Sequence, residues 1–370
     1  MSTIHDLHPS IAANTPAIVS APMLGISSPN LAVSVTRAGG LGFIGGGYDS
    51  TKTETLLSTA ADLLSSSPIS SYNKVANDPL PVGIGFLNWG ATLPDALPAL
   101  QKHTPAAVWL FAAPDPNPQD TLATWTSEIR RATNNRTRIW IQIGSVKEAL
   151  DVAEKAKPDV LVVQGSDAGG HGLVRGASII SLVPETRDAL THAGYGGIPL
   201  VAAGGISDGR GVAAALCLGA QGVVMGTRFL ACSEAAISGG YQREVLRVTD
   251  GGVSTVRTTV YDIMRGYNAW PERYDGRGVE NVTVRDREAG MDDKENQKLY
   301  QEEMKKGDAG WGPEGRLTTY AGTGIGLVKE VRTAGEIVRG AVAEARKVVD
   351  AVNEGFVGLR VREDLGGEND

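Results

Sequence analysis

His171 is the side chain whose type and position in this sequence best suit proton transfer. It lies between Gly170 and Gly172 in the segment QGSDAGGHGL, which directly follows the apolar run 160–165. An imidazole exchanges a proton near neutral pH and can act as a general base. A lone histidine is more often structural, but the flanking glycines leave this ring free of neighbouring side-chain bulk. We therefore predict that His171 is catalytic.

The other four histidines occupy places that do not suggest chemistry. We expect two in a frayed N-terminal segment and two at the C-terminal ends of helices, where a histidine complements the helix dipole. None has a second histidine or a cysteine at a spacing typical of a metal site, so we predict no metal. In chain order they are His5, His8, His103 and His192.

Glycine clusters indicate a second kind of site, for a phosphate. The chain has 47 glycines in 370 residues, whereas about 7% is the average. The motifs AAGGI (202–206) and VMGTR (224–228) would each offer backbone N–H groups at the start of a helix, an arrangement that binds phosphate. Glycines that only form tight turns explain either motif alone, but the pair on neighbouring strands favours a phosphate site. The candidates are Gly204, Gly205, Gly226 and Thr227.

Two further segments could lie against a flat ring. Ala21, Pro22 and Met23 end the first apolar run of the chain, and Asn88 ends the third. A buried amide must be hydrogen-bonded, and a ring edge with donors and acceptors would satisfy Asn88. A role in capping its own loop fits the position of Asn88 equally well.

The elements that must position these residues are eight short apolar runs. They are continuously apolar, which is typical of strands buried on both faces, and helix-like segments separate them at a pitch of roughly 29 residues, as in a (β/α)8 TIM barrel. An open doubly wound sheet is the competing architecture, but eight regular units favour the barrel. The runs are 18–23, 41–47, 82–88, 106–113, 138–144, 160–165, 199–205 and 222–227, and the helix-like segments are 29–37, 53–64, 93–101, 119–131, 145–156, 180–191 and 208–218.

This alternation stops after the eighth run. The following residues are more polar, with an aromatic middle and a highly charged stretch, and we interpret them as a smaller inserted cap domain. Thr333 and Glu336 then form a capping box, which begins a helix whose apolar stripe can return to the barrel wall. We therefore divide the chain into a barrel (1–232 and 319–356), a cap (233–318) and an acidic tail (357–370).

Charge and composition exclude several classes of partner. The formal net charge is −7 and no basic stripe is present, so nucleic acid and anionic membranes are unsuitable partners. The two cysteines, Cys217 and Cys232, cannot form a disulfide framework, and we expect a reducing, cytoplasmic location. We find no secretory signal and no apolar run of about 18 residues. The sequence leaves open whether the chain forms a homodimer.

Taken together, the motifs resemble the nitronate monooxygenase family, formerly called 2-nitropropane dioxygenases, and within it the fungal members of the histidine-containing class. The resemblance covers residues 17 to 346. It implies an FMN-dependent barrel that oxidises nitronates or nitroalkanes with O2 to carbonyl compounds and nitrite. The motifs that carry it are AGGLGFIGGG, GIGFLNW, VVQGSDAGGHG, AAGGISDGRGVAAALCLGAQGVVMGTRF and YAGTGIGLVKEV.

The resemblance also implies roles for individual residues, with His171 as the base. Residues near the ring system would line it or bond its polar edge, and a second group would cradle the phosphate. The ring-binding group is Pro22, Met23, Asn88, Gln164, Gly169 and Gly170, and the phosphate-binding group is Gly204, Gly205, Val224, Met225, Gly226 and Thr227.

Two departures from the family leave details open. Asp167 stands where many bacterial members have glutamate, so the role of this carboxylate is undecided. The fifth strand ends without a lysine or arginine, and Gln142 is the neutral candidate for the flavin edge.

The alternative function is an FMN-dependent NAD(P)H enoyl or quinone reductase of the same barrel superfamily. The cap, with Tyr261, Tyr267 and Trp270 as either core or pocket residues, would select the substrate. Trp89 and Tyr320 are weaker pocket candidates.

Overall fold

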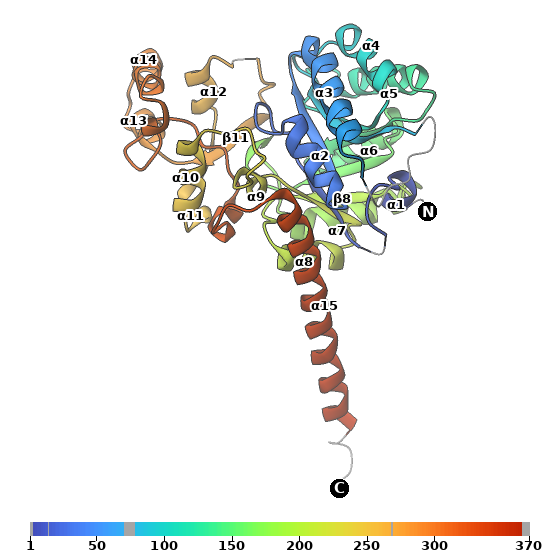
Figure 1. Ribbon diagram of the computed structural model, residues 1–370. Coiled ribbons are helices and arrows are strands. Elements are labelled where there is room, and N and C mark those ends of the chain that lie inside the picture. The colour runs from blue at the N-terminus through green and yellow to red at the C-terminus, as the bar shows by residue number, and fades with distance from the viewer. Residues whose placement is uncertain (1–2, 14, 70–77, 268, 365–370) are drawn as a thin grey trace.

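Eight parallel strands close into a barrel (Figure 1). The computed structural model describes residues 3–13, 15–69, 78–267 and 269–364. Pairing of the last barrel strand with the first closes the ring, which confirms the predicted (β/α)8 fold and excludes the open sheet. The barrel strands are β1 (Ala17–Ser20), β2 (Leu41–Gly47), β3 (Leu80–Leu87), β4 (Pro105–Phe111), β5 (Arg138–Ile143), β6 (Val160–Gln164), β8 (Leu200–Ala203) and β9 (Gly222–Met225).

Helices surround the barrel at the predicted places. The first of them shows how local sequence fixes an end, because the hydroxyl of Ser28 accepts a hydrogen bond from the backbone N–H of Leu31 and Pro29 occupies the first turn. The surrounding helices are α2 (Pro29–Arg37), α3 (Thr53–Ser66), α4 (Leu93–His103), α5 (Pro118–Ala132), α6 (Val146–Lys155), α7 (Ile179–His192), α8 (Gly209–Cys217) and α15 (Ala334–Asp364). As predicted, His103 and His192 lie in the last turns of their helices.

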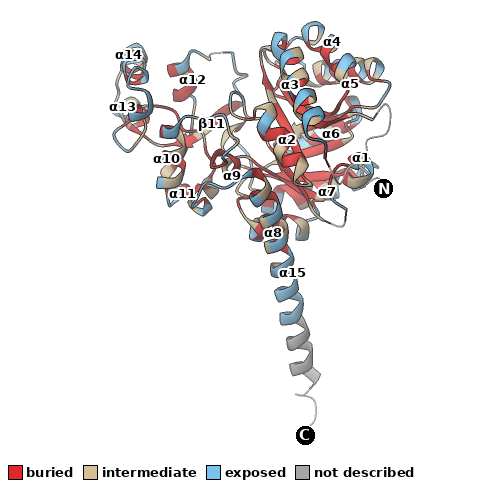
Figure 2. Cartoon of the chain, in the orientation of Figure 1, coloured by how far each residue is buried: buried red, intermediate tan, exposed pale blue. Residues whose placement is uncertain are grey.

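The strands are apolar on both faces because each face packs against a different layer. Val19 and Phe43 belong to the cluster inside the barrel, where Phe43 lies against Trp109 and Trp140 at ring-centroid distances of 5.2 and 5.1 Å. Their chain neighbours, including Ile18, belong to the cluster between strands and helices. Figure 2 shows both layers as buried strands beneath helices with exposed outer faces.

A short N-terminal helix, α1 (Ile4–Leu7), begins with a capping box formed by Thr3 and Asp6. His8 follows it, and the indole Nε1 of Trp140 inside the barrel donates a hydrogen bond to Nε2 of His8 (2.9 Å). The expectation of a frayed start is therefore wrong for His8, which is fully buried. Burial lowers the pKa of His8 to about 3.

A small antiparallel sheet, which the sequence did not predict, takes two of its three strands from the cap. Its strand order is β10 (Thr255–Thr258), β11 (Tyr274–Val279) and β7 (Gly170–Leu173). The last of these belongs to the segment that follows barrel strand β6, so the sheet joins the barrel to the inserted residues. Short helices complete the cap: α10 (Gly239–Arg247), α11 (Gly251–Ser254), α12 (Val260–Arg265), α13 (Val282–Glu288) and α14 (Asp293–Met304). Helix α9 (Thr227–Leu230) precedes it in the chain.

The final helix does not stop at the predicted boundary after residue 356. It runs on without a break to Asp364, and its C-terminal half projects away from the barrel (Figure 1). Residues 365–370 of the predicted tail lie outside the described residues. Within the described part of the chain, no helix has the combination of length and apolar character needed to span a bilayer.

Candidate functional site

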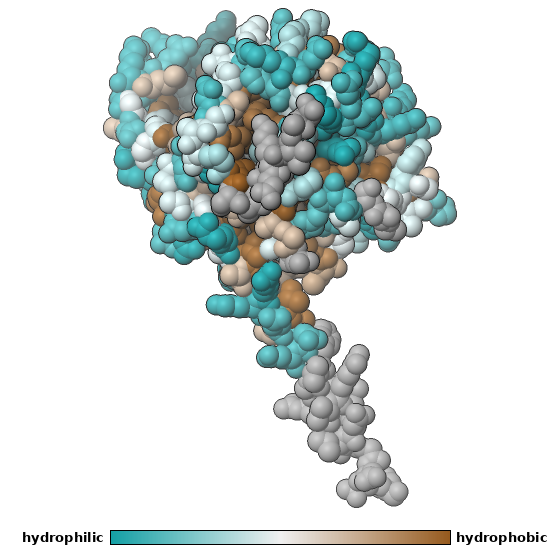
Figure 3. All heavy atoms as spheres, turned by 45° about the vertical axis from the view of Figure 1, so that its right-hand side comes forward, coloured by the Kyte–Doolittle hydropathy of each residue, from teal (hydrophilic) through white to brown (hydrophobic). Residues whose placement is uncertain are grey.

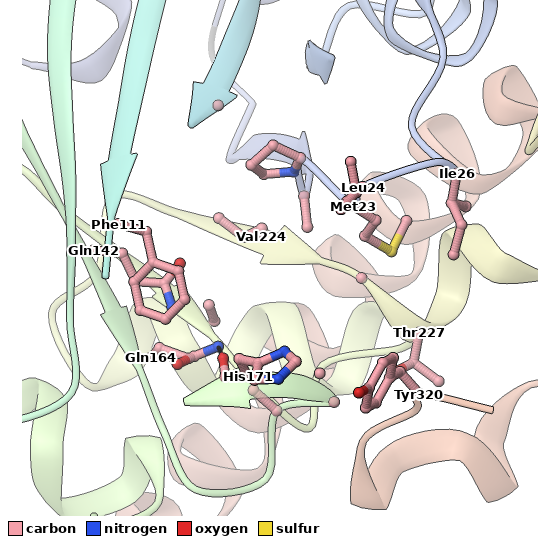
Figure 4. Close-up of a pocket in the computed structure, with 18 of the residues that line it drawn as sticks. Met23, Leu24, Ile26, Phe111, Gln142, Gln164, His171, Val224, Thr227 and Tyr320 are labelled. Atoms are coloured by element: carbon pink, nitrogen blue, oxygen red, sulfur yellow. Dashed lines mark hydrogen bonds between the residues drawn. The ribbon is translucent and has the colours of Figure 1, made fainter. Parts of the chain in front are cut away.

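A cavity lies between the carboxyl ends of the barrel strands and the cap. On the face shown in Figure 3 the periphery is mainly hydrophilic, and apolar residues gather toward the middle. Figure 4 shows side chains from the barrel strands and loops, together with Tyr320, converging on this space. The predicted site residues that line it are Pro22, Met23, Gln164, Gly169, Gly170, His171, Gly204, Gly205, Val224, Gly226 and Thr227.

Two predicted residues do not line the cavity. The side chain of Met225 is fully buried in the layer between the strands and the helices. Asn88 ties β3 to β4, because its Oδ1 accepts a hydrogen bond from the backbone N–H of Phe111 (2.9 Å) and its own N–H donates to the Phe111 carbonyl (2.8 Å). Its buried Nδ2 has no hydrogen-bond partner among the described residues.

One end of the cavity is built from backbone. Gly204 and Gly205 both have positive φ angles, +112° and +74°, which favour glycine. A Cβ on Gly204 would lie only 3.0 Å from the backbone N of Ala168. Thr227 also lines the cavity, and its Oγ1 accepts a hydrogen bond from the N–H of Gly322 (2.9 Å). This end of the lining therefore offers N–H groups and hydroxyls without a cationic side chain.

The backbone of His171 is fixed by two elements. Strand β7 pairs with β11 so that His171 lies opposite Gly276. From barrel strand β6, the Nε2 of Gln164 donates a hydrogen bond to the carbonyl of His171 (3.0 Å), and Figure 4 shows the two side by side. The predicted base is thus held at the junction of the barrel and the cap.

The imidazole of His171 contacts two side chains of the cap and also Tyr320, which follows the cap in the chain. Its Nε2 lies 2.8 and 2.9 Å from the two carboxylate oxygens of Asp262 on α12. The indole of Trp270 stacks on the ring, with centroids 3.7 Å apart and an interplanar angle of 4°. The hydroxyl of Tyr320 donates to Oδ1 of Asp262 (2.9 Å). Burial, and then the charge of Asp262, raise the pKa of Tyr320 well above its ordinary value, so Tyr320 remains a neutral donor.

Asp262 is the functional residue that the sequence interpretation missed. It is the single acidic residue between positions 251 and 271, and it is 5% exposed. Its isolation from other acidic residues is a weak signal, because nothing local shows that its partner lies 91 residues away.

The remaining wall of the cavity is largely aromatic. Tyr48 stacks on Trp89 with centroids 5.0 Å apart, and Tyr267 contacts Tyr48 from the cap. Of the cap aromatics, Tyr267 and Trp270 line the cavity, whereas Tyr261 is core and donates its hydroxyl to the carbonyl of Val279. The weaker candidates Trp89 and Tyr320 both line it.

Two polar residues left open by the sequence have distinct surroundings. The Oε1 of Gln142 accepts a hydrogen bond from the indole of Trp109 (3.1 Å), and its buried Nε2 has no partner among the described residues. Asp167 lies outside the lining, where its Oδ1 accepts from the hydroxyl of Thr323 (3.0 Å). Arg265 is the only lysine or arginine among the described lining residues, and its guanidinium carbon lies 4.8 Å from the ring centroid of Tyr267.

Charged residues on the other face of the small sheet hold the segment that precedes His171. Arg257 pairs with Asp275 (2.8 Å) and also donates to the carbonyl of Ala168 (3.4 Å). Arg277 donates to the carbonyl of Ser166 (3.2 Å). These contacts fix the segment between β6 and β7, which contains Gly169 and Gly170.

Comparison with known proteins gives consistent results. The family model "Nitronate monooxygenase" matches residues 120–344. The chain is 50% identical to nitronate monooxygenase npaC of Metarhizium robertsii, covering 91% of this chain and 93% of that protein. It is 38% identical to a nitronate monooxygenase of Neurospora crassa, covering 91% of each.

Solved structures show the same architecture. A nitroalkane oxidase from Streptomyces ansochromogenes superimposes with a TM-score of 0.70 at 26% identity, covering 95% of this chain and 100% of that one. FabK from Thermotoga maritima also gives 0.70, at 23% identity, covering 96% and 99%. At that identity, the likeness to FabK concerns the fold alone.

Proposed function

Because the chain belongs to the nitronate monooxygenase family, we propose that it oxidises alkyl nitronates and nitroalkanes with O2, giving carbonyl compounds and nitrite. Members of this family are flavin enzymes, and we propose FMN as the flavin. The observation that carries the proposal is that one cavity contains both His171 and an end lined by the backbone of Gly204 and Gly205.

The residues present fit a flavin mononucleotide. Buried Nδ2 of Asn88 and Nε2 of Gln142 lack partners among the described residues, and both are donors that acceptors on a ring edge would satisfy. At the other end, N–H groups beside Gly204 and Gly205 suit a phosphate. Asn88 does not line the cavity itself, but it lies between the lining residues Leu87 and Trp89. The residues proposed to hold FMN are Asn88 and the lining residues Pro22, Met23, Gln142, Gln164, Gly169, Gly170, Gly204, Gly205, Val224, Gly226 and Thr227.

When bound, the flavin supplies the oxidation–reduction chemistry of the reaction. His171 supplies proton chemistry: it removes the α-proton of a neutral nitroalkane, which a preformed nitronate has already lost. Its ring lies at the cavity wall with the side chain 11% exposed, so it is reachable from the cavity and shielded from bulk water.

The rest of the wall suits a small anionic substrate with an apolar group. Aromatic side chains such as Trp89 and Tyr267 exclude water and contact an alkyl chain. Arg265 is the only lysine or arginine in the described lining, and its positive charge favours the entry of a nitronate anion. We propose that the cap, together with β7, selects the substrate, that the barrel carries the flavin and that the protein is cytoplasmic.

Nitrite release tests the proposal. The purified, FMN-loaded protein should release nitrite from a preformed alkyl nitronate in air, and a heat-denatured sample should not. Anaerobic mixing with NADPH tests the reductase alternative, which is supported only by the shared fold. Rapid loss of flavin absorbance with NADPH, without nitrite from nitronates, would replace our proposal by that alternative.

A further inference from the structure

The contacts of His171 determine which of its two nitrogens can accept a proton. Nε2 faces both oxygens of Asp262 at 2.8 and 2.9 Å. A carboxylate accepts hydrogen bonds, so the neutral imidazole must carry its hydrogen on Nε2. None of the described residues hydrogen-bonds Nδ1, which is therefore the nitrogen with a free lone pair.

Asp262 is itself fixed by Tyr320, which follows the cap in the chain. Tyr320 donates its hydroxyl to Oδ1 (2.9 Å), and the ring of Tyr320 covers Gly276, the residue paired with His171. Arg265 lies on the same helix as Asp262, with its guanidinium carbon 5.7 Å from the centre of the Tyr320 ring. Asp262 is buried, with its side chain 7% exposed. A buried carboxylate held in one place can fix the orientation of its partner.

We infer that Asp262 is a positioning residue, which together with Tyr320 keeps His171 in the Nε2–H form and makes Nδ1 the atom that removes the substrate proton. In this step the α-carbon–hydrogen bond breaks and an Nδ1–H bond forms. The electron pair of the broken bond moves into the nitro group and gives the nitronate. His171 becomes a cation, and the facing Asp262 carboxylate and the stacked Trp270 ring both stabilise that cation.

The charged and titratable groups near His171 lie either on its own side of the small sheet, where the ring of Tyr320 is 5.3 Å from the imidazole, or on the opposite face. His171, Gly276 and Thr258 pair across the sheet and share one face. Residues at alternate positions occupy the opposite face. On the His171 face and across the cavity the groups are Asp262, Arg265, Tyr267, Tyr320 and Tyr48, and on the opposite face they are Arg257, Asp275 and Arg277. Asp262 is the carboxylate in contact with the ring.

The inference extends the proposed function, because it assumes that His171 acts as a base. It also explains why the base belongs to the barrel segment while its orientation depends on the cap. A change in the cap at Asp262 should then alter proton removal and leave the oxidation of a preformed nitronate nearly intact.

The first test is the position of the proton, which does not depend on turnover. Nitrogen NMR of 15N-histidine-labelled, FMN-loaded protein distinguishes the two neutral imidazole forms, and His171→Asn identifies the signal of His171 among five histidines. We expect the proton on Nε2 in the wild type and a mixture of both forms in Asp262→Asn. A proton on Nδ1 in the wild type would overturn the inference, whatever the enzyme oxidises.

The second test is kinetic and uses two substrates. Asp262→Asn should lower kcat/KM for a neutral nitroalkane by about tenfold or more and change nitronate oxidation less than about twofold. Tyr320→Phe retains the ring and should give a smaller loss with the same substrate selectivity. Glu244→Gln removes another buried cap carboxylate, which pairs with Arg247, and should leave the nitroalkane kinetics unchanged.

Two kinetic outcomes would refute the inference. Equal losses on both substrates in Asp262→Asn and Tyr320→Phe would show a merely structural role, and unchanged nitroalkane kinetics would show no role. Failure of the wild type to release nitrite from a nitronate would instead refute the proposed function. The NMR result would still establish which nitrogen of His171 carries the proton.

Discussion

Replacing His8 with glutamine should make the fold less sensitive to mild acid. His8 is buried and accepts a hydrogen bond from Trp140, and burial lowers its pKa to about 3 from the ordinary value of 6.5. Because the folded state holds His8 neutral while the unfolded chain binds a proton, stability is fully present above pH 6.5. It falls as the pH drops from there toward 3.

The size of this effect follows from the two pKa values. Between pH 7 and pH 5 the unfolded chain goes from about one-quarter protonated to almost fully protonated at His8, while the folded chain stays almost unprotonated, which costs about 2 kcal/mol of unfolding free energy. Glutamine can still accept the Trp140 hydrogen bond but does not titrate. Between pH 7 and pH 5, the free energy of unfolding of His8→Gln should therefore fall by about 2 kcal/mol less than that of the wild type.

Urea unfolding at pH 7 and pH 5, followed by tryptophan fluorescence, measures the difference. The matched control is His192→Gln, at the exposed end of α7. Its loss of unfolding free energy between pH 7 and pH 5 should equal that of the wild type. An equal loss of unfolding free energy in wild type and His8→Gln would refute the conclusion that His8 is buried as a neutral side chain.

Three further changes test the site. His171→Asn should abolish nitrite release from neutral nitroalkanes and largely spare preformed nitronates; equal loss on both would exclude His171 as the base. Gly276→Ala would place a Cβ 2.6 Å from Cε1 of Tyr320, so it should displace that ring and lower nitroalkane turnover severalfold, with FMN content unchanged. Gly204→Ala should weaken FMN binding, measured by titrating apoprotein, because φ is +112° there and the strain costs about 1–3 kcal/mol. Gly219→Ala carries similar strain (φ +97°) outside the cavity lining and should reduce stability without changing FMN affinity.

The barrel could be predicted because its strands are buried on both faces, which produces continuous apolar runs at a regular pitch. Helix ends were nearly right where a capping residue such as Ser28 marks them. Strand β7 has only four residues, two of them glycine, and pairs with β11 about one hundred residues later. A local pattern carries no signal for such a pairing.

The site was predictable to the extent that it is made of unusual local sequence. Glycine clusters and a histidine among glycines stand out in one chain. Asp262 does not, because its role depends on a contact 91 residues away, and the same residue on a surface helix would be an ordinary solvated acid. For Met225, which faces the helices, the continuous apolar run could not show which face of β9 it occupies.

The most direct test of the central claim is the visible absorbance of the purified protein before and after a nitronate is added without oxygen. We predict the spectrum of bound FMN, its rapid loss on addition of the nitronate, and recovery with nitrite release when air is admitted. An FMN spectrum that NADPH bleaches and a nitronate leaves unchanged would contradict the account.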